Sequence, residues 1–332
     1  MQPTTIAEAA LPPGQNQPFL DIVDFVERTT YAIWNDRNPD LVGRWYGPRS
    51  VIRSDSGDLI GGDVVTEGTR ERLRAFPDYR GIIHDTIWTG DDESGFRTSM
   101  RWTAQGTLGG GPTHGPPPAS GPGVVHNSAI ANCVVLHGQY VEEWAGENPA
   151  HLDAQLGIDS DSPATVLPDV QQAAPAHTDS PTAADHGATV PAVPQRVDGP
   201  GLLVVELLHD LYNRRDLGAV QRAYAGGAPY TFGASRWQAG HDGVRAEVGR
   251  WLDLLPDSRA TVDELYWMDE APGRARVAVR FRVNGTAAGD RPVEIMAIHH
   301  LHVRGGLVVA EWSEYDELAL RRQLQGTVQP VG

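Results

Sequence analysis

Hydrophobic and polar positions follow the same course twice along the chain. Residues 19–38 and 202–224 carry apolar side chains at three- and four-residue spacing, which predicts an amphipathic helix at the start of each half. A shorter helical pattern follows in each half, at 66–76 and 242–255, and a Pro-Asp pair ends it. Three to four strands then alternate apolar and polar residues, and the last two form a hairpin. Helices followed by an antiparallel sheet predict an α+β fold in each half.

The similarity between the halves extends to individual residues. A shift of 179 positions places residues 77–107 on 256–286 with eight identities in 31 positions, where about two are expected by chance. A shift of 168 positions places residues 124–144 on 292–312 with eight more identities, and both segments end on Glu-Trp. We therefore predict a tandem duplication.

Between the two halves lies a segment of different composition. Residues 158–200 are rich in Ala, Pro, Asp, Thr and Ser and contain no aromatic residue. Such a segment buries too little apolar area to offset the entropy of ordering it, which predicts a flexible linker. The predicted organisation is a disordered N-terminus at 1–18, a first domain at 19–157, the linker at 158–200, a second domain at 201–326 and a tail at 327–332.

Charge, hydropathy and cysteine content narrow the class of protein. Asp and Glu number 43 against 27 Lys and Arg, an excess that argues against a nucleic-acid partner or an anionic membrane surface. No run of about 18 apolar residues is present, and the N-terminus lacks the basic and apolar regions of a secretory signal. The one cysteine, Cys133, lies in an apolar segment and predicts a buried thiol. These features predict a cytoplasmic protein.

The helix pair, the strands and the final hairpin resemble the nuclear transport factor 2-like cone fold, and more narrowly its SnoaL-like polyketide cyclase branch. The segments "GQYVEEWAGEN" and "GGLVVAEWSEYD" look like the final strand of that family, and residues 101–123 look like its Gly/Pro-rich turn between two long strands. The resemblance implies two tandem cone domains, each with helices packed on a curved antiparallel sheet. Because cones of this type commonly pair sheet to sheet, it also implies a monomer with an internal pseudo-dimer, or a homodimer.

The chain departs from this family at the usual catalytic position. The resemblance implies an Asp directly after the final-strand Trp as the general acid/base, but this sequence has Ala145 and Ser313 there, and neither side chain abstracts a proton at neutral pH. Strand alternation offers a substitute, because Glu143 and Glu311 point to the same face as those two positions. On the preceding strand the same argument places His299 on the inward face.

Glu311, His299 and Glu143 are therefore the candidate catalytic residues. A carboxylate in an apolar pocket has a raised pKa, which suits proton abstraction, and the imidazole of His299 would orient the substrate or carry the proton. The first half has Ala131 in place of this histidine, so only the second half offers the pair. Two alternatives stay open: the glutamates pair with arginines on neighbouring strands for stability alone, or they anchor a ligand.

Aromatic side chains complete the expected pocket and suit a flat, partly apolar small molecule. The candidate substrate-binding residues, among which the aspartate forms an acidic rim, are Trp88, Trp144, Trp267, Trp312, Tyr212, Tyr266 and Asp85. His300 and His302 stand two residues apart, but no further His or Cys at ligand spacing supports a metal site. We expect no metal and no cofactor.

These expectations favour cofactor-independent acid/base catalysis on a small cyclic or aromatic organic molecule. Cyclisation, isomerisation and dehydration all fit, as in an isomerase or lyase of secondary metabolism. Two alternatives are a non-catalytic small-molecule binder or scaffold, and an epoxide or ester hydrolase. The hydrolase would need an Asp-Arg-Asp relay inside the cone, whereas Arg276 and Arg280 are expected on the outward face. The expected partner is a small-molecule substrate, with no nucleic acid and no membrane.

Overall fold

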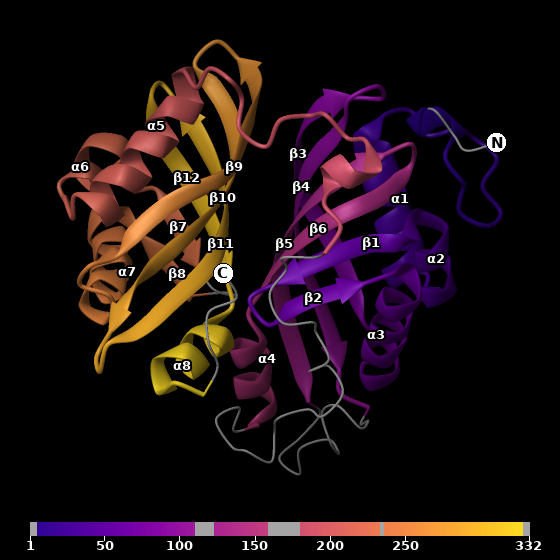
Figure 1. The fold of residues 1–332 in the computed structure, drawn as a ribbon, viewed down its shortest axis with the longest axis horizontal. Coiled ribbons are helices and arrows are strands. Elements are labelled where there is room, and N and C mark those ends of the chain that lie inside the picture. Colours follow the sequence, from indigo (N-terminus) through magenta and orange to yellow (C-terminus); the bar gives the residue numbers. More distant parts are fainter. Residues whose placement is uncertain (1–4, 110–122, 159–179, 233–235, 328–332) are drawn as a thin grey trace. The chain divides into compact units, whose positions relative to one another are not determined.

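The computed structural model describes residues 5–109, 123–158, 180–232 and 236–327 (Figure 1). The chain divides into two compact units, each described here by itself. The first comprises Met1–Ala145 with Ala150–Val190, and the second comprises Gly146–Pro149 with Pro191–Gly332.

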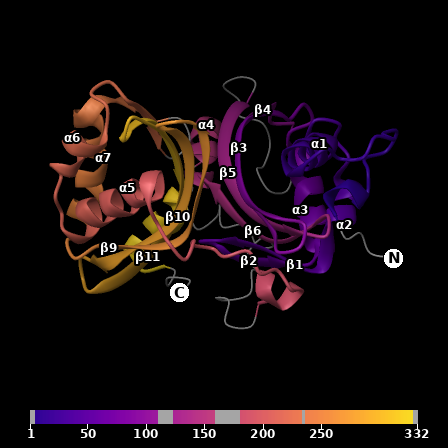
Figure 2. The ribbon, with the colours of Figure 1, turned by 90° about the horizontal axis from the view of Figure 1, so that it is seen from above.

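The first unit contains one six-stranded sheet with α1, α2 and α3 on one of its faces and the short helix η4 on the other. Its helices are η1 (Ile6–Glu8), α1 (Ile22–Trp34), η2 (Pro39–Leu41), α2 (Val42–Trp45), α3 (Gly62–Ala75), α4 (Pro149–Leu156) and η4 (Ala183–His186). Its strands are β1 (Tyr46–Ser54), β2 (Gly57–Ile60), β3 (Arg80–Asp91), β4 (Gly95–Thr107), β5 (Val124–Leu136) and β6 (Gln139–Glu147). They lie in the order β2-β1-β6-β5-β4-β3, with β1 parallel to β6. Figure 2 shows β3, β4 and β5 curving around the side where α1 lies.

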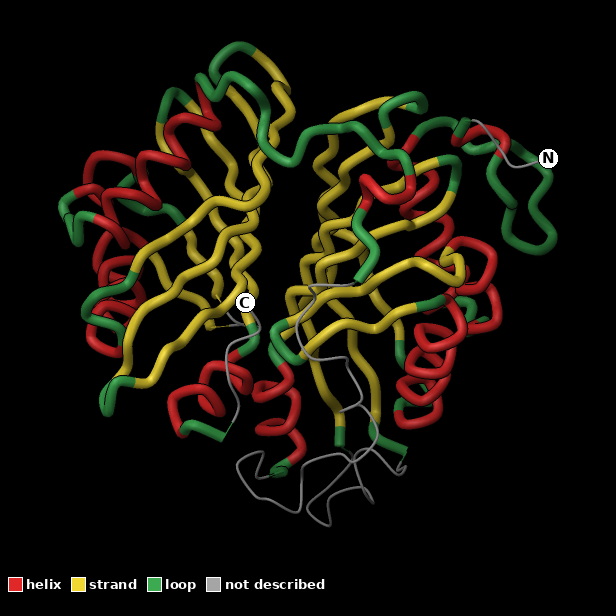
Figure 3. The backbone as a smooth tube through the Cα atoms, in the orientation of Figure 1, coloured by secondary structure: helices red, strands yellow, loops and turns green. Residues whose placement is uncertain are grey.

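The second unit repeats this topology strand for strand. Its helices are α5 (Gly199–Leu208), the π-helical segment η5 (His209–Asn213), α6 (Ala219–Ala223), α7 (Gly240–Leu254) and α8 (Glu317–Gln325). Its strands are β7 (Pro229–Phe232), β8 (Arg236–Ala239), β9 (Arg259–Ala271), β10 (Arg274–Ala287), β11 (Arg291–Arg304) and β12 (Leu307–Tyr315). They lie in the order β8-β7-β12-β11-β10-β9, with β12 parallel to β7. Figure 3 shows the strands in yellow and the helices in red. The predicted duplication and the α+β layout are confirmed.

In each unit the main core lies between the helices and one face of the sheet. Along β10, Val277, Val279 and Phe281 belong to the core of the second unit. Arg276 and Arg280 occupy the alternate positions and point to the opposite face, as their spacing predicts. We call the face that meets the helices the inner face and the other one the outer face.

The residues that are identical in both copies hold one corner of each unit together. Asp78 accepts a hydrogen bond from the backbone N–H of Thr107, and Asp257 accepts one from that of Thr286, each at 2.6 Å. Both pairs join the turn after a helix to the end of a long strand. The preceding glycine is also constrained, because a Cβ on Gly285 would lie 2.9 Å from Oδ1 of Asp257. The repeated Pro-Asp and Gly-Thr pairs are therefore the two sides of one contact.

The structure differs from the expected linker at residues 180–190. Ala183, Ala188 and Val190 are buried against apolar side chains on the outer face of the first sheet, around Val134 and Val141. Thr182 and Asp185 form a capping box that begins η4. Small apolar residues thus provide enough contact to order this stretch, which belongs to the first unit. Of the remaining linker, residues 159–179 lie outside the described residues.

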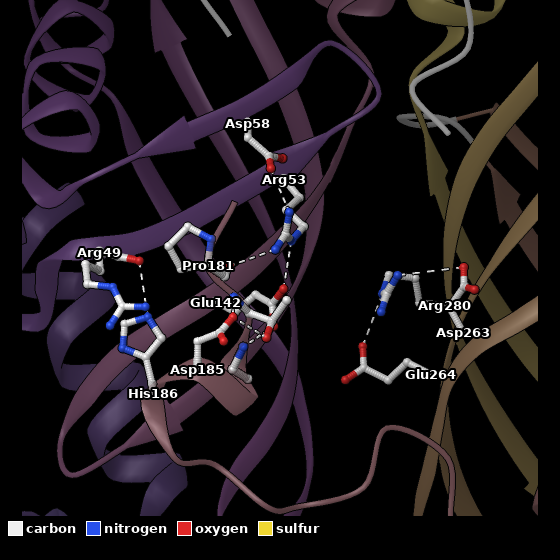
Figure 4. A network of polar contacts seen from close by, with 12 residues as sticks. Arg49, Arg53, Asp58, Glu142, Pro181, Asp185, His186, Asp263, Glu264 and Arg280 are labelled. Atoms are coloured by element: carbon white, nitrogen blue, oxygen red, sulfur yellow. Dashed lines mark hydrogen bonds and ion pairs between the residues drawn. The ribbon is translucent and has the colours of Figure 1, made fainter. Parts of the chain in front are cut away.

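A buried ion-pair network joins this segment to the first sheet (Figure 4). Arg53 contacts Asp58 at 2.6 Å and Glu142 at 2.7 Å, and it donates a hydrogen bond to the carbonyl of Pro181 at 2.8 Å. The second oxygen of Glu142 accepts the backbone N–H of Ala183. Both carboxylates are almost completely buried, so the arginine compensates two charges at once.

The N-terminal segment is also more ordered than expected. Ile6 and Ala9 are buried in the core of the first unit, and the indole of Trp45 donates a hydrogen bond to the carbonyl of Ala10. The prediction of a disordered segment at 1–18 is therefore wrong for these residues, because two apolar side chains suffice to anchor it. Residues 328–332 of the expected tail lie outside the described residues.

We expect the two aspartate contacts to make stability depend on acid pH. The hydrogen bonds from Thr107 and Thr286 lower the pKa of Asp78 and of Asp257 below the ordinary value. A carboxylate whose pKa is lower in the folded state stabilises the fold above its unfolded pKa of about 4, and this contribution is lost as pH falls through the folded pKa. The double variant Asp78→Asn/Asp257→Asn should therefore lose free energy of unfolding less steeply than the wild type between about pH 5 and pH 2.

Urea unfolding followed by circular dichroism at each pH measures this slope. Asp242→Asn is the matched control, because its side chain is fully exposed. Equal slopes for the double variant and the wild type would contradict the proposed contribution.

The Arg53 network leads to a second stability prediction. Arg53→Ala leaves Asp58 and Glu142 buried without their cation, so the free energy of unfolding should fall by about 3 kcal/mol or more. Arg74→Ala removes an exposed contact to Glu67 and should change it by less than about 1 kcal/mol. Chemical denaturation of both variants tests the difference, and similar losses would argue against a special role for the network.

Candidate functional site

A buried cluster of ionisable side chains in the second unit centres on Glu311. This residue lies on β12 with 3% of its surface exposed. One carboxylate oxygen accepts a hydrogen bond from the hydroxyl of Tyr224, and the other lies 2.5 Å from Nδ1 of His299. His299 is 5% exposed, and its ring packs edge-on against Phe281. The carboxylate is therefore held from two sides inside an apolar core.

The strand register brings these side chains together. On the paired strands β11 and β12, His299 lies opposite Ser313 and Leu301 lies opposite Glu311. All four side chains share the inner face, because each strand alternates with a period of two. The inward orientation expected for Glu311 and His299 is what the structure has. Tyr224 reaches the same place from the end of α6, where it forms an isolated bridge with Val308.

A small cavity lies between this cluster and the helices. Its volume is about 10 Å³, which is about the space that one water molecule needs. The lining is mainly aliphatic and comes from α5, η5, α7 and the sheet. The lining residues are Val204, Leu207, Leu208, Leu211, Tyr212, Tyr224, Tyr230, Val244, Val248, Val279, His299, Leu301 and Glu311.

Of the aromatic residues expected in the second pocket, the structure places only Tyr212 in the cavity wall. Trp312 lies on the outer face, where its ring meets that of His302 at 4.9 Å. Tyr266 pairs with Ala278 and also points outward. Trp267 packs at the edge of the core against α5, because a Cβ on Gly201 would lie 2.4 Å from its ring. The expected wall is therefore wrong for these three residues: the cavity is lined by aliphatic residues and tyrosines.

The first unit has a related but incomplete cluster. The hydroxyl of Tyr46 donates a hydrogen bond of 2.5 Å to Glu143, the counterpart of Glu311. Ala131 occupies the position of His299, so the first unit has a methyl group where the second has the imidazole. Glu143 is partly exposed, whereas Glu311 is buried. The tyrosine–glutamate pair is thus common to both copies, and the histidine is special to the second.

The other residues predicted for the first pocket divide between the two faces. Trp88 lies at the inner face, where its ring packs edge-on against that of Phe96. Trp144 packs with the outer-face cluster that includes Ala183, so the structure does not place it in the pocket. Asp85 is buried opposite Arg101, which also points outward. Trp144 and Asp85 are therefore wrong as pocket residues, and the reason in both cases is strand alternation.

Sequence reasoning missed both tyrosines that hold the glutamates. Tyr224 lies 178 positions after Tyr46, which is within one residue of the 179-position shift of the repeat. The repeat could therefore have identified the two tyrosines as a matching pair. Reasoning from the sequence also missed a second buried cluster, in which Arg250 contacts Glu247 at 2.7 Å and the hydroxyl of Tyr315 at 2.5 Å. Arg250 and Glu247 lie on α7 and Tyr315 lies on β12, and hydrophobic periodicity does not predict contacts between residues so far apart in the sequence.

Burial controls the ionisation of the tyrosines around the cavity. The pKa of Tyr224 lies well above its ordinary value, first because the phenol is desolvated and second because of the negative charge of Glu311. The pKa of Tyr230 is raised for the same two reasons. Both hydroxyls therefore stay protonated at neutral pH, and Tyr224 acts as a hydrogen-bond donor to the carboxylate.

Two further observations bear on the class of site. Within the described ranges, no group of three or more His, Cys, Asp or Glu side chains is arranged to hold a metal ion. No helix in the part of the chain that the structure describes is both long and apolar enough to cross a membrane.

Comparisons with known proteins give a family for the second half. Residues 202–324 match the family model described as SnoaL-like polyketide cyclase. No curated protein sequence matches the chain.

Solved structures with a similar fold include three bacterial proteins. Wild-type IdmH from Streptomyces antibioticus is 20% identical, with 39% of this chain and 99% of that one covered and a TM-score of 0.34. AclR from Streptomyces galilaeus is 22% identical, with 38% and 80% covered and a TM-score of 0.32. A protein with a ketosteroid isomerase-like fold from Catenulispora acidiphila is 16% identical, with 40% and 97% covered and a TM-score of 0.33. At these identities and TM-scores, none of them bears on the activity of this chain.

The two sheets share one strand order, and both units place their long α-helices on the inner face. This is the tandem α+β arrangement that the nuclear transport factor 2-like resemblance implied. Residues 202–324 match the model of SnoaL-like polyketide cyclases, and the first unit has the same strand order as this part of the chain.

Proposed function

We propose that the second unit is a cofactor-independent acid/base enzyme that acts on a small cyclic or aromatic molecule. The observation that carries this proposal is the buried carboxylate of Glu311, bound by His299 and Tyr224 and open to the cavity. A carboxylate that is kept from bulk water and held in one orientation is suited to take a proton from a bound substrate. Cyclisation, isomerisation and dehydration each begin or end with such a transfer.

Each of the three side chains has a separate role in this proposal. Glu311 is the base that takes the proton. His299 fixes one carboxylate oxygen through Nδ1 and would share the proton once it has been transferred. Tyr224 donates to the other oxygen, so that both oxygens are held and each keeps a second lone pair in a fixed direction. The aliphatic lining excludes water, which strengthens these interactions.

The volume of the cavity favours a second candidate function. A cavity of about 10 Å³ is far smaller than the roughly 300 Å³ or more of most ligand sites, so a ring-sized substrate must displace lining side chains to enter. A filled interior is what a non-catalytic binder or scaffold would have. An epoxide or ester hydrolase is less favoured, because Arg276 and Arg280 lie on the outer face. Cytoplasmic location and the oligomeric state stay predictions from the sequence.

The proposed base can be tested with a substrate that needs only proton abstraction. We expect the wild type to open the ring of 5-nitrobenzisoxazole, a flat aromatic molecule that releases a coloured phenolate when a base removes its ring proton. Glu311→Gln keeps the size and hydrogen-bonding capacity of the side chain but removes the base, so kcat should fall at least about a hundredfold. Stopped-flow absorbance measures the rate.

Glu294→Gln is the matched control, because Glu294 lies on β11 but pairs with Arg282 on the outer face. Its kcat should equal that of the wild type. Activity that survives in Glu311→Gln would remove Glu311 as the base. A wild type with no turnover, in a protein that binds the compound, would favour the non-catalytic binder.

We also expect the buried tyrosines to ionise only when the protein unfolds. Burial raises the pKa of five of the nine tyrosines, namely Tyr46, Tyr140, Tyr212, Tyr224 and Tyr230. A group whose pKa is raised in the folded state contributes stability below its unfolded pKa of about 10, and this contribution is lost as pH rises toward the folded pKa.

Phenolate absorbance and far-ultraviolet circular dichroism, recorded together through alkaline pH, test this expectation. The late phenolate signal should coincide with the loss of circular dichroism, and Tyr224→Phe should reduce it by the absorbance of one phenolate. Ionisation of all the tyrosines near pH 10 in a folded protein would contradict the buried arrangement.

A further inference from the structure

We propose that Tyr212 is a further catalytic residue of the second unit, whose hydroxyl donates a hydrogen bond to the substrate oxygen on which negative charge develops. This role rests on the proposed function, in which Glu311 takes the proton. It narrows the substrate class to molecules that present an oxygen acceptor close to an acidic C–H bond.

Tyr212 lines the cavity together with the proposed base. It is 5% exposed, and the centroid of its ring lies 6.0 Å from that of Phe281. The pKa of Tyr212 is raised, first by burial and then by the negative charges of Glu247 and Glu311. Because a charge acts in this way only at short range, the hydroxyl lies within electrostatic reach of Glu311. The phenol is therefore protonated at neutral pH and can act as a donor.

The other two tyrosines of the cavity wall already have partners. Tyr224 donates to Glu311, and Tyr230 is hydrogen-bonded to Ser313. The hydroxyl of Tyr212 makes no hydrogen bond to any other residue that the structure describes. A buried hydroxyl without a partner is costly, so its position in the wall of a cavity points to a partner inside that cavity.

The π-helical segment η5 holds Tyr212 in place. The N–H of Arg214 donates to the carbonyl of His209 at 3.0 Å, five residues back, and π-helical turns of this kind occur frequently at functional sites. The side chain of Asn213, the next residue after Tyr212, accepts the N–H of Ala260 at 2.6 Å and donates to the carbonyl of Ala260 at 3.2 Å. These bonds attach the end of the helix to β9, so the donor needs little reorganisation when a substrate binds.

The first unit shows that this scaffold does not require a tyrosine. There the side chain of Asn35 makes the same two hydrogen bonds to the backbone of Gly81, each at 2.9 Å. The residue before it is Trp34, whose ring packs against those of Tyr79 and Trp102. An aromatic side chain without a hydroxyl therefore fills the corresponding position, and the hydroxyl is specific to the second unit.

The volume of the cavity matches one oxygen atom with its hydrogens. About 10 Å³ is the space of one water molecule, which in the resting protein would accept a hydrogen bond from Tyr212 and donate one to Glu311. A substrate with an oxygen atom facing Tyr212 and an acidic C–H bond facing Glu311 replaces both interactions of this water. The rest of the substrate displaces aliphatic side chains of α5, as the proposed function already requires.

The proposed step leaves the net charge of the cavity unchanged. Glu311 takes the proton and becomes neutral, while the electron pair of the broken C–H bond moves into the substrate and the negative charge collects on its oxygen. The charge of Glu247 opposes this step little, because Arg250 contacts it at 2.7 Å. A donor placed at the developing charge stabilises the transition state more than the ground state.

Two substrates with different leaving groups test the role of Tyr212. In benzisoxazole and in 5-nitrobenzisoxazole, the electron pair of the C–H bond forms a nitrile, the N–O bond breaks and the oxygen becomes a phenolate. Without the nitro group this phenolate is a poorer leaving group and depends more on a donor. Tyr212→Phe keeps the ring and removes the donor, so kcat should fall about tenfold for the nitro compound and about a hundredfold for benzisoxazole, with KM nearly unchanged.

Tyr266→Phe is the matched control, because Tyr266 is also buried but points to the outer face. It should keep the kcat of the wild type for both compounds. A merely structural role of Tyr212 would lower both rates by the same factor, so equal losses in Tyr212→Phe would overturn the proposal.

The outcomes also separate this role from the proposed function. Turnover that is lost in Glu311→Gln but equals that of the wild type in Tyr212→Phe would overturn the role of Tyr212 and leave Glu311 as the base. Turnover that survives in Glu311→Gln, or a wild type that turns over neither compound, would overturn the base and the role of Tyr212 with it.

Discussion

In both units, the side chains of the long strands alternate between a face covered by helices and a face that is not. Because this period is two, a shift of one residue moves a side chain from the enclosed interior to the outer face. Glu311 lies inside and its neighbour Trp312 lies outside for this reason alone. The hydrogen bonds of Glu311 to His299 and Tyr224 exist only because the register of β11 and β12 places the acid and the imidazole on the same face.

Much of the fold followed from this periodicity and from the duplication. The repeat predicted two copies of one topology, and the structure has the same strand order in both. Alternation also placed Glu311 and His299 together on the inner face. The same rule places Trp312 on the outer face, since adjacent residues of a strand point to opposite faces. The prediction of Trp312 as a pocket residue did not apply this rule and is wrong. Tyr224 could not be placed by alternation, because it reaches the cluster from the end of a helix.

Other features depended on three-dimensional packing that no local pattern records. The cavity volume is set by how side chains from α5, η5 and α7 meet the sheet, and the sequence gives no measure of it. Residues 180–190 look like a linker by composition, yet Ala183 and Val190 find an apolar face to cover, and Arg53 reaches the carbonyl of Pro181. A single small apolar residue is a weak indication of a core position in the sequence, because it is buried only where another surface of the protein covers it.

The two copies retain one feature that packing does not require. A buried carboxylate loses several kcal/mol of hydration, and apolar residues of similar volume often replace buried charges without loss of stability. Both units nevertheless keep a glutamate on the inner face with a tyrosine hydroxyl bound to it. Their surroundings have changed, because the position of His299, which binds Glu311, is occupied by Ala131 in the first unit. The glutamate–tyrosine pair therefore does not follow from packing alone, since apolar side chains would fill the same space at lower cost in hydration.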